Sequence, residues 1–255
     1  QIVHYAGNPC NMDQIMEIAD KYGVYVIEDC AHAPGSEYNG RKCGTIGDIG
    51  CFSFFSNKNM TTAEGGMITT NNDGLAKQIK LMRSHGMTVM TLDRHKGRAF
   101  SYDVVALGYN YRIDEIRSAI GIAQLKKLED DNIRRREIDQ MYRERLADVR
   151  CVEVPFKTKG GSSSHHIFPV LLGKKVGRQE FMEFLKSNGI QSSIHYPPIH
   201  LFDYYCRNFG CHEGMLPITE EVAEREVTLP LYPSMTDKDV HRVSDVIVKY
   251  FEERK

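Results

Sequence analysis

The sequence predicts an α/β protein whose larger domain is built on a mostly parallel sheet and whose second domain is a smaller α+β unit. A helix pattern leads straight into an unbroken apolar run at residues 24–27, which is the order of elements found in parallel sheets. Glycine-rich turns then separate two more short apolar segments. After a long charged helix, strand and helix patterns alternate twice more, which indicates the second domain.

The first half of the chain supplies the elements of the expected sheet. Asn11 is a good N-cap, apolar residues at positions 12, 15, 16 and 19 share one helix face, and Gly23 is a typical residue at the end of such a helix. The apolar run that follows suits a strand buried on both faces. We expect strands at 24–27, 50–55 and 66–70, and an amphipathic helix at 73–84.

A long helix connects the two predicted domains. Asp114 is a suitable N-cap, and the apolar spacing after it predicts a helix that continues, bent or broken, to Asp148. The three arginines at 134–136 have acidic neighbours on both sides and are expected to form a solvated helix face. We therefore divide the chain into domains at residues 1–130 and 131–255. In the second domain we expect strands at 166–172 and 190–195 and helices at 179–187 and 237–252.

Composition and charge exclude several classes of protein. The 255 residues are 41% hydrophobic and 26% charged, which is ordinary for a globular chain with a large core. A formal net charge of −1 provides no general field for nucleic acid or for an anionic membrane. No apolar run approaches the ~20 residues that span a bilayer, and the first residues lack the pattern of a signal peptide. We expect a cytoplasmic protein whose partners are small molecules or other protein chains.

Seven cysteines form an odd set without a C-x-x-C pair, which argues against a disulfide framework and against a zinc ribbon. Reduced thiols are the simplest interpretation. His200, Cys206, Cys211 and His212 are residue types that bind transition metals, but their spacing fits none of the usual zinc patterns. We therefore expect surface and core side chains there and no metal.

One group of polar residues directly follows the strand predicted at 24–27. In open α/β sheets ligands bind beyond the carboxyl ends of the strands, so Asp29 and His32 stand where a ligand would lie. A carboxylate at that position needs a partner, and the protonated ring nitrogen of a cofactor would supply one. Taken alone, an Asp at a strand end is more often a helix N-cap or a member of a buried ion pair.

A second group surrounds Lys58, which follows the aromatic strand predicted at 50–55. Apolar surroundings disfavour the ammonium form of a lysine, and a neutral amine is the form that attacks an aldehyde. The hydroxyl of Ser53 can hydrogen-bond a phosphate, and Gly65 and Gly66 let the backbone approach a ligand or a neighbouring strand closely. Taken singly, such a lysine is usually a solvated surface residue and a Gly-Gly pair is usually a turn.

Together these segments resemble the DegT/StrS-type aminotransferases. These are pyridoxal-phosphate proteins of the aspartate aminotransferase fold, PLP-transferase fold type I, that act on keto-sugars attached to nucleotides. The sequence Glu-Asp-Cys-Ala-His-Ala-Pro-Gly at 28–35 is similar to a segment of this family. The resemblance implies that Asp29 pairs with the pyridine nitrogen of the cofactor and that His32 lies by its 3-hydroxyl.

Two further motifs carry the resemblance. The sequence Ser-Phe-Phe-Ser-Asn-Lys at 53–58 is similar to the family's Schiff-base motif, which implies Ser53 on the phosphate and Lys58 on the aldehyde. Some relatives that are dehydratases have His in place of this lysine, so Lys58 favours amino transfer. The sequence Gly-Tyr-Asn-Tyr-Arg at 108–112 resembles the G-x-N-x-R signature, whose Asn reaches the phosphate of the neighbouring subunit's cofactor. Asn110 therefore implies a homodimer with shared active sites.

The resemblance covers nearly the whole chain, since the segments at 194–201 and 228–233 are similar to recurrent segments of the family's small domain. Family members carry on the order of a hundred further residues in front, which contribute to the large domain. The chain has no initiator methionine, and we expect that part to be missing here. Its phosphate loop and its stacking aromatic residue have no counterpart in residues 1–20. An incomplete cofactor site and an uncovered sheet edge are expected as a result.

The function that the resemblance implies is the transfer of an amino group from an amino acid such as glutamate to a nucleotide-linked keto-sugar, with pyridoxal 5'-phosphate as the cofactor. Lys58 would be both anchor and base, Asp29 would keep the pyridine nitrogen protonated, and His32 would tune the 3-hydroxyl. Three alternatives stay open: a non-catalytic fragment or interaction subunit of the same fold, a dehydratase or epimerase with the same cofactor, and a metal hydrolase at 200–212.

The sugar, the ring position, the nucleotide and the amino donor depend on loops such as 87–102. His195, Tyr196 and His200 are candidates for the sugar pocket, and packing inside the small domain is an equally good interpretation of the three.

Overall fold

The structure is a computed structural model that describes residues 1–89, 96–97, 101–156 and 161–254, and it divides into two compact units. One unit contains residues 1–129 together with the strand at 161–162, and the other contains the remaining residues from 130 onward. In the described residues, no helix combines the length and the apolar character that crossing a membrane requires.

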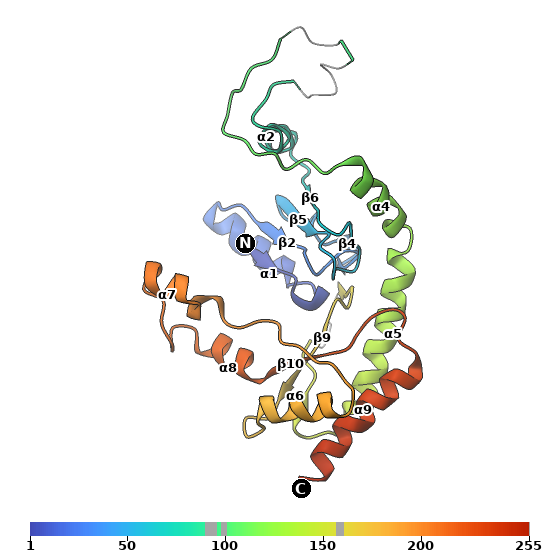
Figure 1. Ribbon diagram of the computed structural model, residues 1–255. Coiled ribbons are helices and arrows are strands. Elements are labelled where there is room, and N and C mark those ends of the chain that lie inside the picture. Colours follow the sequence, from blue (N-terminus) through green and yellow to red (C-terminus); the bar gives the residue numbers. More distant parts are fainter. Residues whose placement is uncertain (90–95, 98–100, 157–160, 255) are drawn as a thin grey trace. The chain divides into compact units, whose positions relative to one another are not determined.

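The first unit holds two small sheets and three α-helices among its described residues (Figure 1). Its elements are β1 (Ile2–Val3), the 3-10 helix η1 (Tyr5–Gly7), α1 (Met12–Tyr22), β2 (Ile27–Asp29), β3 (Glu37–Tyr38), β4 (Arg41–Lys42), β5 (Ile49–Ser53), β6 (Gly66–Thr69), α2 (Asp73–Arg83), α4 (Glu115–Leu125) and β8 (Gly161–Ser162). The main sheet has the strand order β1-β2-β5-β6, and the second sheet has the order β4-β3-β8.

The main sheet is parallel through β1, β2 and β5, and only β6 runs antiparallel to its neighbour. Asp29 stands opposite Cys51 in the register of β2 and β5, so these two strands end at the same edge of the sheet. The strand expected at 24–27 begins later than predicted, because the Val26 amide donates to the Asp48 carboxylate at 2.7 Å and does not pair with β1. Val24, Tyr25 and Ile27 are exposed, so the prediction of burial on both faces is wrong for these three residues.

The helices of this unit begin and end near the predicted residues. Asn11 caps α1 by accepting the Gln14 amide, and Gly23 ends it with a φ of 61°, a conformation that glycine adopts without strain. The apolar spacing predicted for 114–123 belongs to α4, but Ile116 is 77% exposed, so that spacing does not face the core of this unit.

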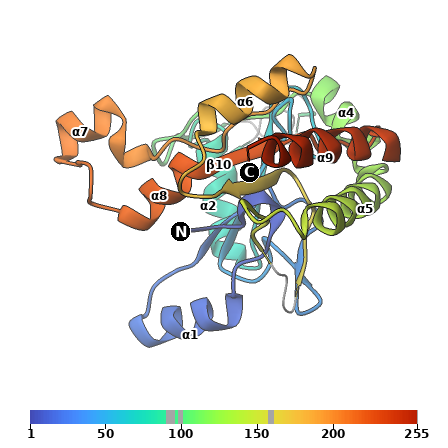
Figure 2. The ribbon, with the colours of Figure 1, turned by 90° about the horizontal axis from the view of Figure 1, so that it is seen from below.

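The second unit is a three-stranded antiparallel sheet covered by helices. Its elements are α5 (Leu128–Leu146, which begins two residues before the unit does), β7 (Val152–Glu153), β9 (Phe168–Leu172), α6 (Arg178–Ser187), the 3-10 helix η2 (Ile199–Leu201), α7 (Asp203–Phe209), α8 (Pro217–Arg225), β10 (Glu226–Leu229) and α9 (Asp237–Glu252). The strand order is β10-β9-β7, and apolar residues of α5, α6 and α9 pack with β9 and β10 in a single core. Figure 2 shows α6 and α9 beside β10.

Of three predictions for the second half of the chain, one is confirmed and two are wrong at least in part. The predicted break in the long helix is confirmed at 126–127, between α4 and α5. The solvated face predicted for 134–136 is wrong at Arg135, which is 7% exposed, because it lies one and two helical turns before the core residues Ile138 and Tyr142. The segment at 190–195 is not a strand, since only Ser193 forms a bridge, with Thr228 of β10.

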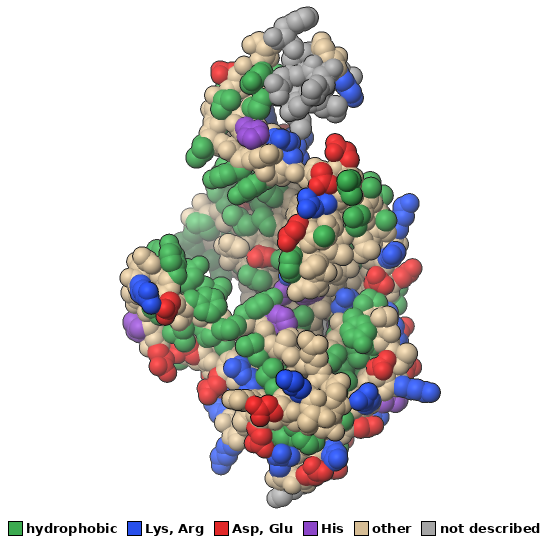
Figure 3. Space-filling model, viewed as in Figure 1, with side chains coloured by type: hydrophobic (Ala, Val, Ile, Leu, Met, Phe, Trp, Pro, Cys, Tyr) green, Lys and Arg blue, Asp and Glu red, His purple; other side chains and the backbone are tan. Residues whose placement is uncertain are grey.

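The segment from η2 to α8 is distinct from the core of its unit. Large apolar side chains lie at its surface, and Figure 3 shows them as a green area on the left. The exposed residues include Ile199, Phe202, Tyr204, Phe209 and Ile218.

Candidate active site

The carboxyl ends of β2 and β5 bring the first candidate residue, Asp29, to the edge of the sheet. Its Oδ1 accepts the Ala31 amide at 3.0 Å, which holds the side chain in a short turn beyond the strand. Among the described residues no hydrogen bond reaches Oδ2. Burial raises the pKa of the neighbouring Cys51 thiol, and the negative charge of Asp29 raises it further. The Asp29 carboxylate therefore lies at the strand end with one oxygen available to a ligand.

Lys58 lies in the turn after β5, and its backbone amide donates to the Phe55 carbonyl at 3.0 Å. The side chain is half-buried, and this burial lowers the pKa of the ammonium group, while the charge of Asp29 acts in the opposite direction. The described residues form no ion pair with its Nζ. The structure therefore gives Lys58 the surroundings expected from the sequence. The side chain is partly desolvated, and one carboxylate is close enough to affect its pKa.

Ser53 is the last residue of β5 and pairs with Gly66 of β6. Its Oγ accepts the Phe55 amide at 3.3 Å, so the hydroxyl hydrogen is available for donation. A Cβ at Gly65 would lie 2.3 Å from the Thr62 hydroxyl oxygen, and one at Gly66 would lie 2.9 Å from a backbone oxygen of β5. Glycine is therefore required at both positions, because neighbouring chain segments lie too close for a side chain.

His32 is buried beside η1. Its Nδ1 accepts the backbone amide of Ala6 at 3.3 Å, and its ring lies 6.0 Å from that of Tyr5. The three positions Asp29, His32 and Lys58 therefore belong to one compact unit. The structure records electrostatic coupling between Asp29 and Lys58, and the prediction that all three form one site stays a prediction.

Sequence reasoning missed a buried polar network next to Asp29. Glu28 and His4 are both fully buried, and His4 Nε2 lies 3.0 Å from Glu28 Oε2. The same carboxylate accepts the backbone amides of Gly44, Ile46 and Gly47 at 2.7–2.8 Å. The available signal was Glu28 itself, a charged residue directly after the apolar run at 24–27, since such a residue requires partners when it is buried.

This network is also where potential metal ligands meet. In the described residues, one group of metal-ligating side chains has suitable spacing: His4, Glu28 and Cys30, all buried. Each Glu28 oxygen already accepts two hydrogen bonds, and His4 Nδ1 accepts the Cys10 amide at 3.1 Å. The hydrogen bonds therefore occupy the ligand atoms of the carboxylate and of the imidazole.

The cluster considered from the sequence at 200–212 makes hydrogen bonds that tie loops together. His200 Nε2 lies 2.8 Å from Glu220 Oε1, and the same carboxylate accepts the amides of Gly214 and Leu216. His212 Nδ1 contacts the Glu213 carbonyl oxygen. These contacts give His200 and His212 partners within the chain.

His195 also makes contacts within its own unit. Its Nδ1 lies 2.8 Å from the Thr228 hydroxyl oxygen, and its amide donates to Glu226 Oε2 at 2.7 Å. Tyr196 is 50% exposed. These bonds favour packing as the role of His195, whereas the exposed ring of Tyr196 is compatible with a ligand contact.

Asn110 is exposed and forms an isolated backbone bridge with Ser84. The rings of its neighbours Tyr109 and Tyr111 stack at 4.9 Å. No described contact joins Asn110 to Asp29 or Lys58, and its assignment to a neighbouring subunit's site stays a prediction. The loop at 87–102, expected to select the substrate, lies partly outside the described residues.

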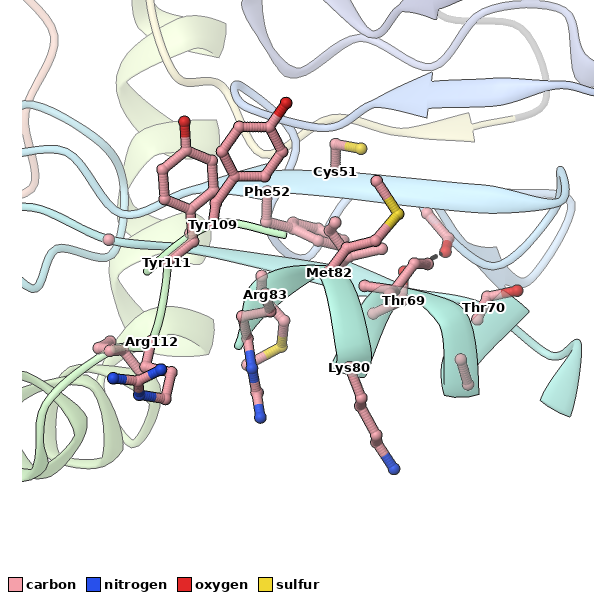
Figure 4. A pocket seen from close by; sticks show the side chains of 18 of the residues that line it. Cys51, Phe52, Thr69, Thr70, Lys80, Met82, Arg83, Tyr109, Tyr111 and Arg112 are labelled. Carbon is pink, nitrogen blue, oxygen red and sulfur yellow. Dashed lines mark hydrogen bonds between the residues drawn. The ribbon is translucent and has the colours of Figure 1, made fainter. Parts of the chain in front are cut away.

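A cavity of about 1200 Å³ opens on the first unit, and its lining includes Cys51 and Gly66, the strand partners of Asp29 and Ser53 (Figure 4). Apolar groups of β5, β6 and α2 provide much of its lining, including Phe52 and Met82, and Tyr109 and Tyr111 stand at one end. None of the predicted site residues lines it. Because β6 is an edge strand of the described sheet, this hollow is the kind of apolar surface that further polypeptide covers in larger sheets.

Comparisons with known proteins agree with this fold and these motifs. The sequence model of the DegT/DnrJ/EryC1/StrS aminotransferase family matches residues 1–248. The protein MJ1066 of Methanocaldococcus jannaschii is 43% identical over 99% of the chain. Two solved structures superpose on 98% of the chain: PseC of Helicobacter pylori, an aminotransferase involved in the biosynthesis of pseudoaminic acid (30% identity, TM-score 0.90), and Spr1654 of Streptococcus pneumoniae in its PLP form (27%, TM-score 0.88).

The chain spans about two thirds of the length of these relatives: 67% of MJ1066, 66% of PseC and 67% of Spr1654. The structural matches confirm the expected PLP-transferase fold of type I, with its α/β large domain. With a family match over nearly its full length, the chain belongs to the DegT/DnrJ/EryC1/StrS aminotransferase family.

Proposed function

We propose that the protein containing this chain is a pyridoxal 5'-phosphate-dependent aminotransferase that moves an amino group from an amino acid such as glutamate to a nucleotide-linked keto-sugar. The observation that carries the proposal is the lowered pKa of Lys58 next to the charge of Asp29, at the ligand-binding edge of the sheet. Membership of the aminotransferase family supports the reaction class. Free thiols at all seven cysteines agree with a cytoplasmic location.

The donor groups of the candidate site fit this cofactor. Lys58 offers an amine whose neutral form is favoured by burial, Asp29 offers a carboxylate oxygen without a described partner, and Ser53 offers a hydroxyl hydrogen. The aldehyde of the cofactor reacts with an amine, its ring nitrogen pairs with a carboxylate, and its phosphate accepts hydrogen bonds from a hydroxyl. When bound, pyridoxal 5'-phosphate supplies a conjugated ring that withdraws electrons from the bonds of the substrate's α-carbon.

The side chains would divide the work as follows. Lys58 Nζ would hold the cofactor and, as a free amine, would accept a proton from the substrate α-carbon. The Asp29 carboxylate stabilises a proton on the ring nitrogen, because an opposite charge at short range favours the protonated form. The Ser53 hydroxyl donates to a phosphate oxygen and orients it.

A second copy of the chain is part of the proposal. Asn110 is exposed and has no described contact with Asp29 or Lys58, which suits a residue that serves a neighbouring subunit. Helix α4, which follows it, exposes the large apolar side chains of Ile116, Ile122 and Leu125. Apolar helix faces of this kind are typical of subunit interfaces.

The test is the absorption spectrum of the purified chain with added pyridoxal 5'-phosphate. We expect a visible band that borohydride removes, with the reduced label on Lys58 by peptide mass spectrometry. Lys58→Ala should abolish the band, whereas Lys77→Ala, which removes an exposed lysine of α2, should leave it unchanged. Label distributed over many surface lysines would contradict the assignment.

The second candidate function is a chain of the same fold without activity of its own. In that case this chain gives no band, but a longer polypeptide that contains it does. A dehydratase with the same cofactor would turn over a nucleotide sugar without consuming an amino donor. Amino-acid consumption measured against sugar turnover separates that reaction from amino transfer.

A further inference from the structure

The buried pair of Glu28 and His4 has a defined direction of hydrogen bonding. The Cys10 amide donates to His4 Nδ1 at 3.1 Å, so a neutral imidazole carries its hydrogen on Nε2. From Nε2 it donates to Glu28 Oε2 at 3.0 Å. Both residues are completely excluded from solvent, and the carboxylate is held in addition by three backbone amides, those of Gly44, Ile46 and Gly47. The pair is therefore fixed at both of its ends.

The turn η1 directly follows His4 and is held at several points. The His4 amide donates to the Asp29 carbonyl at 3.1 Å, and the Ser36 hydroxyl donates to the Gly7 carbonyl at 2.7 Å. Between them, Ala6 is fully buried and has a φ of 57°, in the left-handed region that a residue with a side chain seldom adopts. The surrounding contacts, rather than the local preference of Ala6, therefore set the direction of its amide.

The Ala6 amide donates to His32 Nδ1 at 3.3 Å. A nitrogen that accepts a hydrogen bond carries no hydrogen, so the neutral His32 ring has its hydrogen on Nε2. Any oxygen that His32 contacts through Nε2 then receives a hydrogen bond.

We propose that the buried Glu28–His4 pair is a positioning device that, through η1, aims the Ala6 amide at His32 and fixes His32 as an Nε2–H donor. The inference deepens the proposed function and rests on it for the identity of the acceptor, an oxygen on the cofactor. Glu28 and His4 are positioning residues that act through His32. A donor at this position stabilises negative charge on the acceptor oxygen.

The first experiment needs no cofactor. Long-range proton–nitrogen NMR of the chain with ¹⁵N-labelled histidine, at about pH 8, which is above the ordinary pKa of an imidazole, reports the tautomer of each neutral ring. The His32 signals are identified by their loss in His32→Gln. We expect the Nε2–H form to exceed the Nδ1–H form by roughly five- to tenfold, because one amide hydrogen bond to Nδ1 favours the Nε2–H form by about that factor. A predominant Nδ1–H form overturns the proposal.

The role of the pair is tested with Glu28→Gln. The Nε2–H preference of His32 should fall several-fold, towards that of an exposed imidazole. The matched control is Asp48→Asn, which alters another carboxylate that accepts a backbone amide of the same unit, that of Val26, without touching η1. An unchanged tautomer ratio in folded Glu28→Gln overturns the role of the pair. If Glu28→Gln does not fold, a scalar coupling between the Ala6 amide hydrogen and His32 Nδ1 in the unaltered chain decides whether that bond exists.

A second readout connects the device to the proposed function. In Gln the side-chain NH₂ takes the place of the imidazole Nε2, whereas in Asn it reaches only as far as Nδ1. His32→Gln should therefore keep the absorption maximum of the chain with pyridoxal 5'-phosphate, and His32→Asn should shift it. The reverse pattern contradicts donation through Nε2. Absence of any band in the unaltered chain, with the expected tautomer of His32, counts against the proposed function and leaves the positioning device supported.

Discussion

Each unit of the chain buries a glutamate, and the two carboxyls respond to burial in opposite ways. Glu28 in the first unit is 0% exposed and Glu226 in the second is 3% exposed. Burial alone raises the pKa of a carboxyl, yet the pKa of Glu28 is lowered because hydrogen bonds from His4 and from three backbone amides outweigh that effect. The pKa of Glu226 is raised, because burial dominates over its hydrogen bonds.

The difference lies in the number and kind of donors. Glu28 accepts four hydrogen bonds, three of them from backbone amides whose direction the chain fixes. Glu226 accepts the Thr228 hydroxyl at 2.5 Å and the His195 amide at 2.7 Å, and the charge of Arg178 helps only in part. At equal depth of burial, a carboxylate is therefore stabilised or destabilised according to how many hydrogen-bond donors it contacts.

The largest effect is expected from Glu28→Gln. The amide group of Gln presents N–H hydrogens to donors that need an acceptor, so at least one buried donor loses its partner at a cost of about 2–4 kcal/mol. We expect faster hydrogen exchange, by mass spectrometry, in peptides that contain residues 44–47, and unchanged exchange in β9 and β10. Asp48→Asn is the control in the same unit, and equal protection in the variant and the unaltered chain would contradict the four-donor interpretation.

The pH dependence of the two units is expected to differ in sign. Because the pKa of Glu28 lies below its ordinary value of 4.5, its stabilisation is complete above that value and is lost as the pH falls through the folded-state pKa. Because the pKa of Glu226 lies above 4.5, its stabilisation is present below that value and is lost as the pH rises through the folded-state pKa.

The measurement is urea denaturation at a series of pH values, followed by hydrogen exchange of peptides from each unit. In the unaltered chain the peptides around 44–47 should lose protection on acidification below pH 4.5, and those around 226–229 should gain relative stability as the pH falls towards it. Glu28→Gln should remove the first dependence and Glu226→Gln the second. Parallel pH profiles for the two units would refute the opposite directions of the two pKa shifts.

The sequence predicted the elements that have strong periodicity and strong caps. Helix α1, with Asn11 at one end and Gly23 at the other, and helix α9 lie within a residue or so of their expected bounds. The strand predicted at 190–195 is reduced to one bridge at Ser193, because strand pairing depends on a partner far along the chain. Local sequence patterns do not indicate which distant segment a strand pairs with.

The residues in and around the candidate site also divide into those that the sequence indicated and those that it did not. The sequence indicated Asp29 and Lys58 because each follows a predicted strand, and Ser53 because it lies in one near the edge where parallel strands end. The network of Glu28 and His4 was not found, because it joins residues 24 positions apart with amides of a loop that has no sequence signature. Arg135 was misplaced for a related reason: local charge predicted exposure, whereas the core of its unit covers that helix face.

A smaller effect is expected from Thr228→Val, which removes the hydroxyl shared by Glu226 and His195. The carboxyl keeps only the His195 amide as a described donor, so its pKa should rise further, and the unit should lose about 1–2 kcal/mol in its free energy of unfolding at neutral pH. Thr228→Ser, which keeps the hydroxyl, is the matched variant. Equal urea midpoints for the Val and Ser variants would show that the shared hydroxyl contributes nothing.

The smallest effect is expected from Glu226→Gln, although the change is chemically the same as Glu28→Gln. The Thr228 hydroxyl can rotate, so it can accept from the Gln amide and direct its own hydrogen to His195 Nδ1, while the Gln oxygen accepts the His195 amide. The oxygen and the nitrogen of the Gln amide then each have a partner, and a destabilised buried charge is removed. We expect a change within about 1 kcal/mol at neutral pH, in either direction. If Glu226→Gln lowers the free energy of unfolding as much as Glu28→Gln does in the same urea titration, depth of burial and not the set of donors determines how a buried carboxylate affects the stability of this chain.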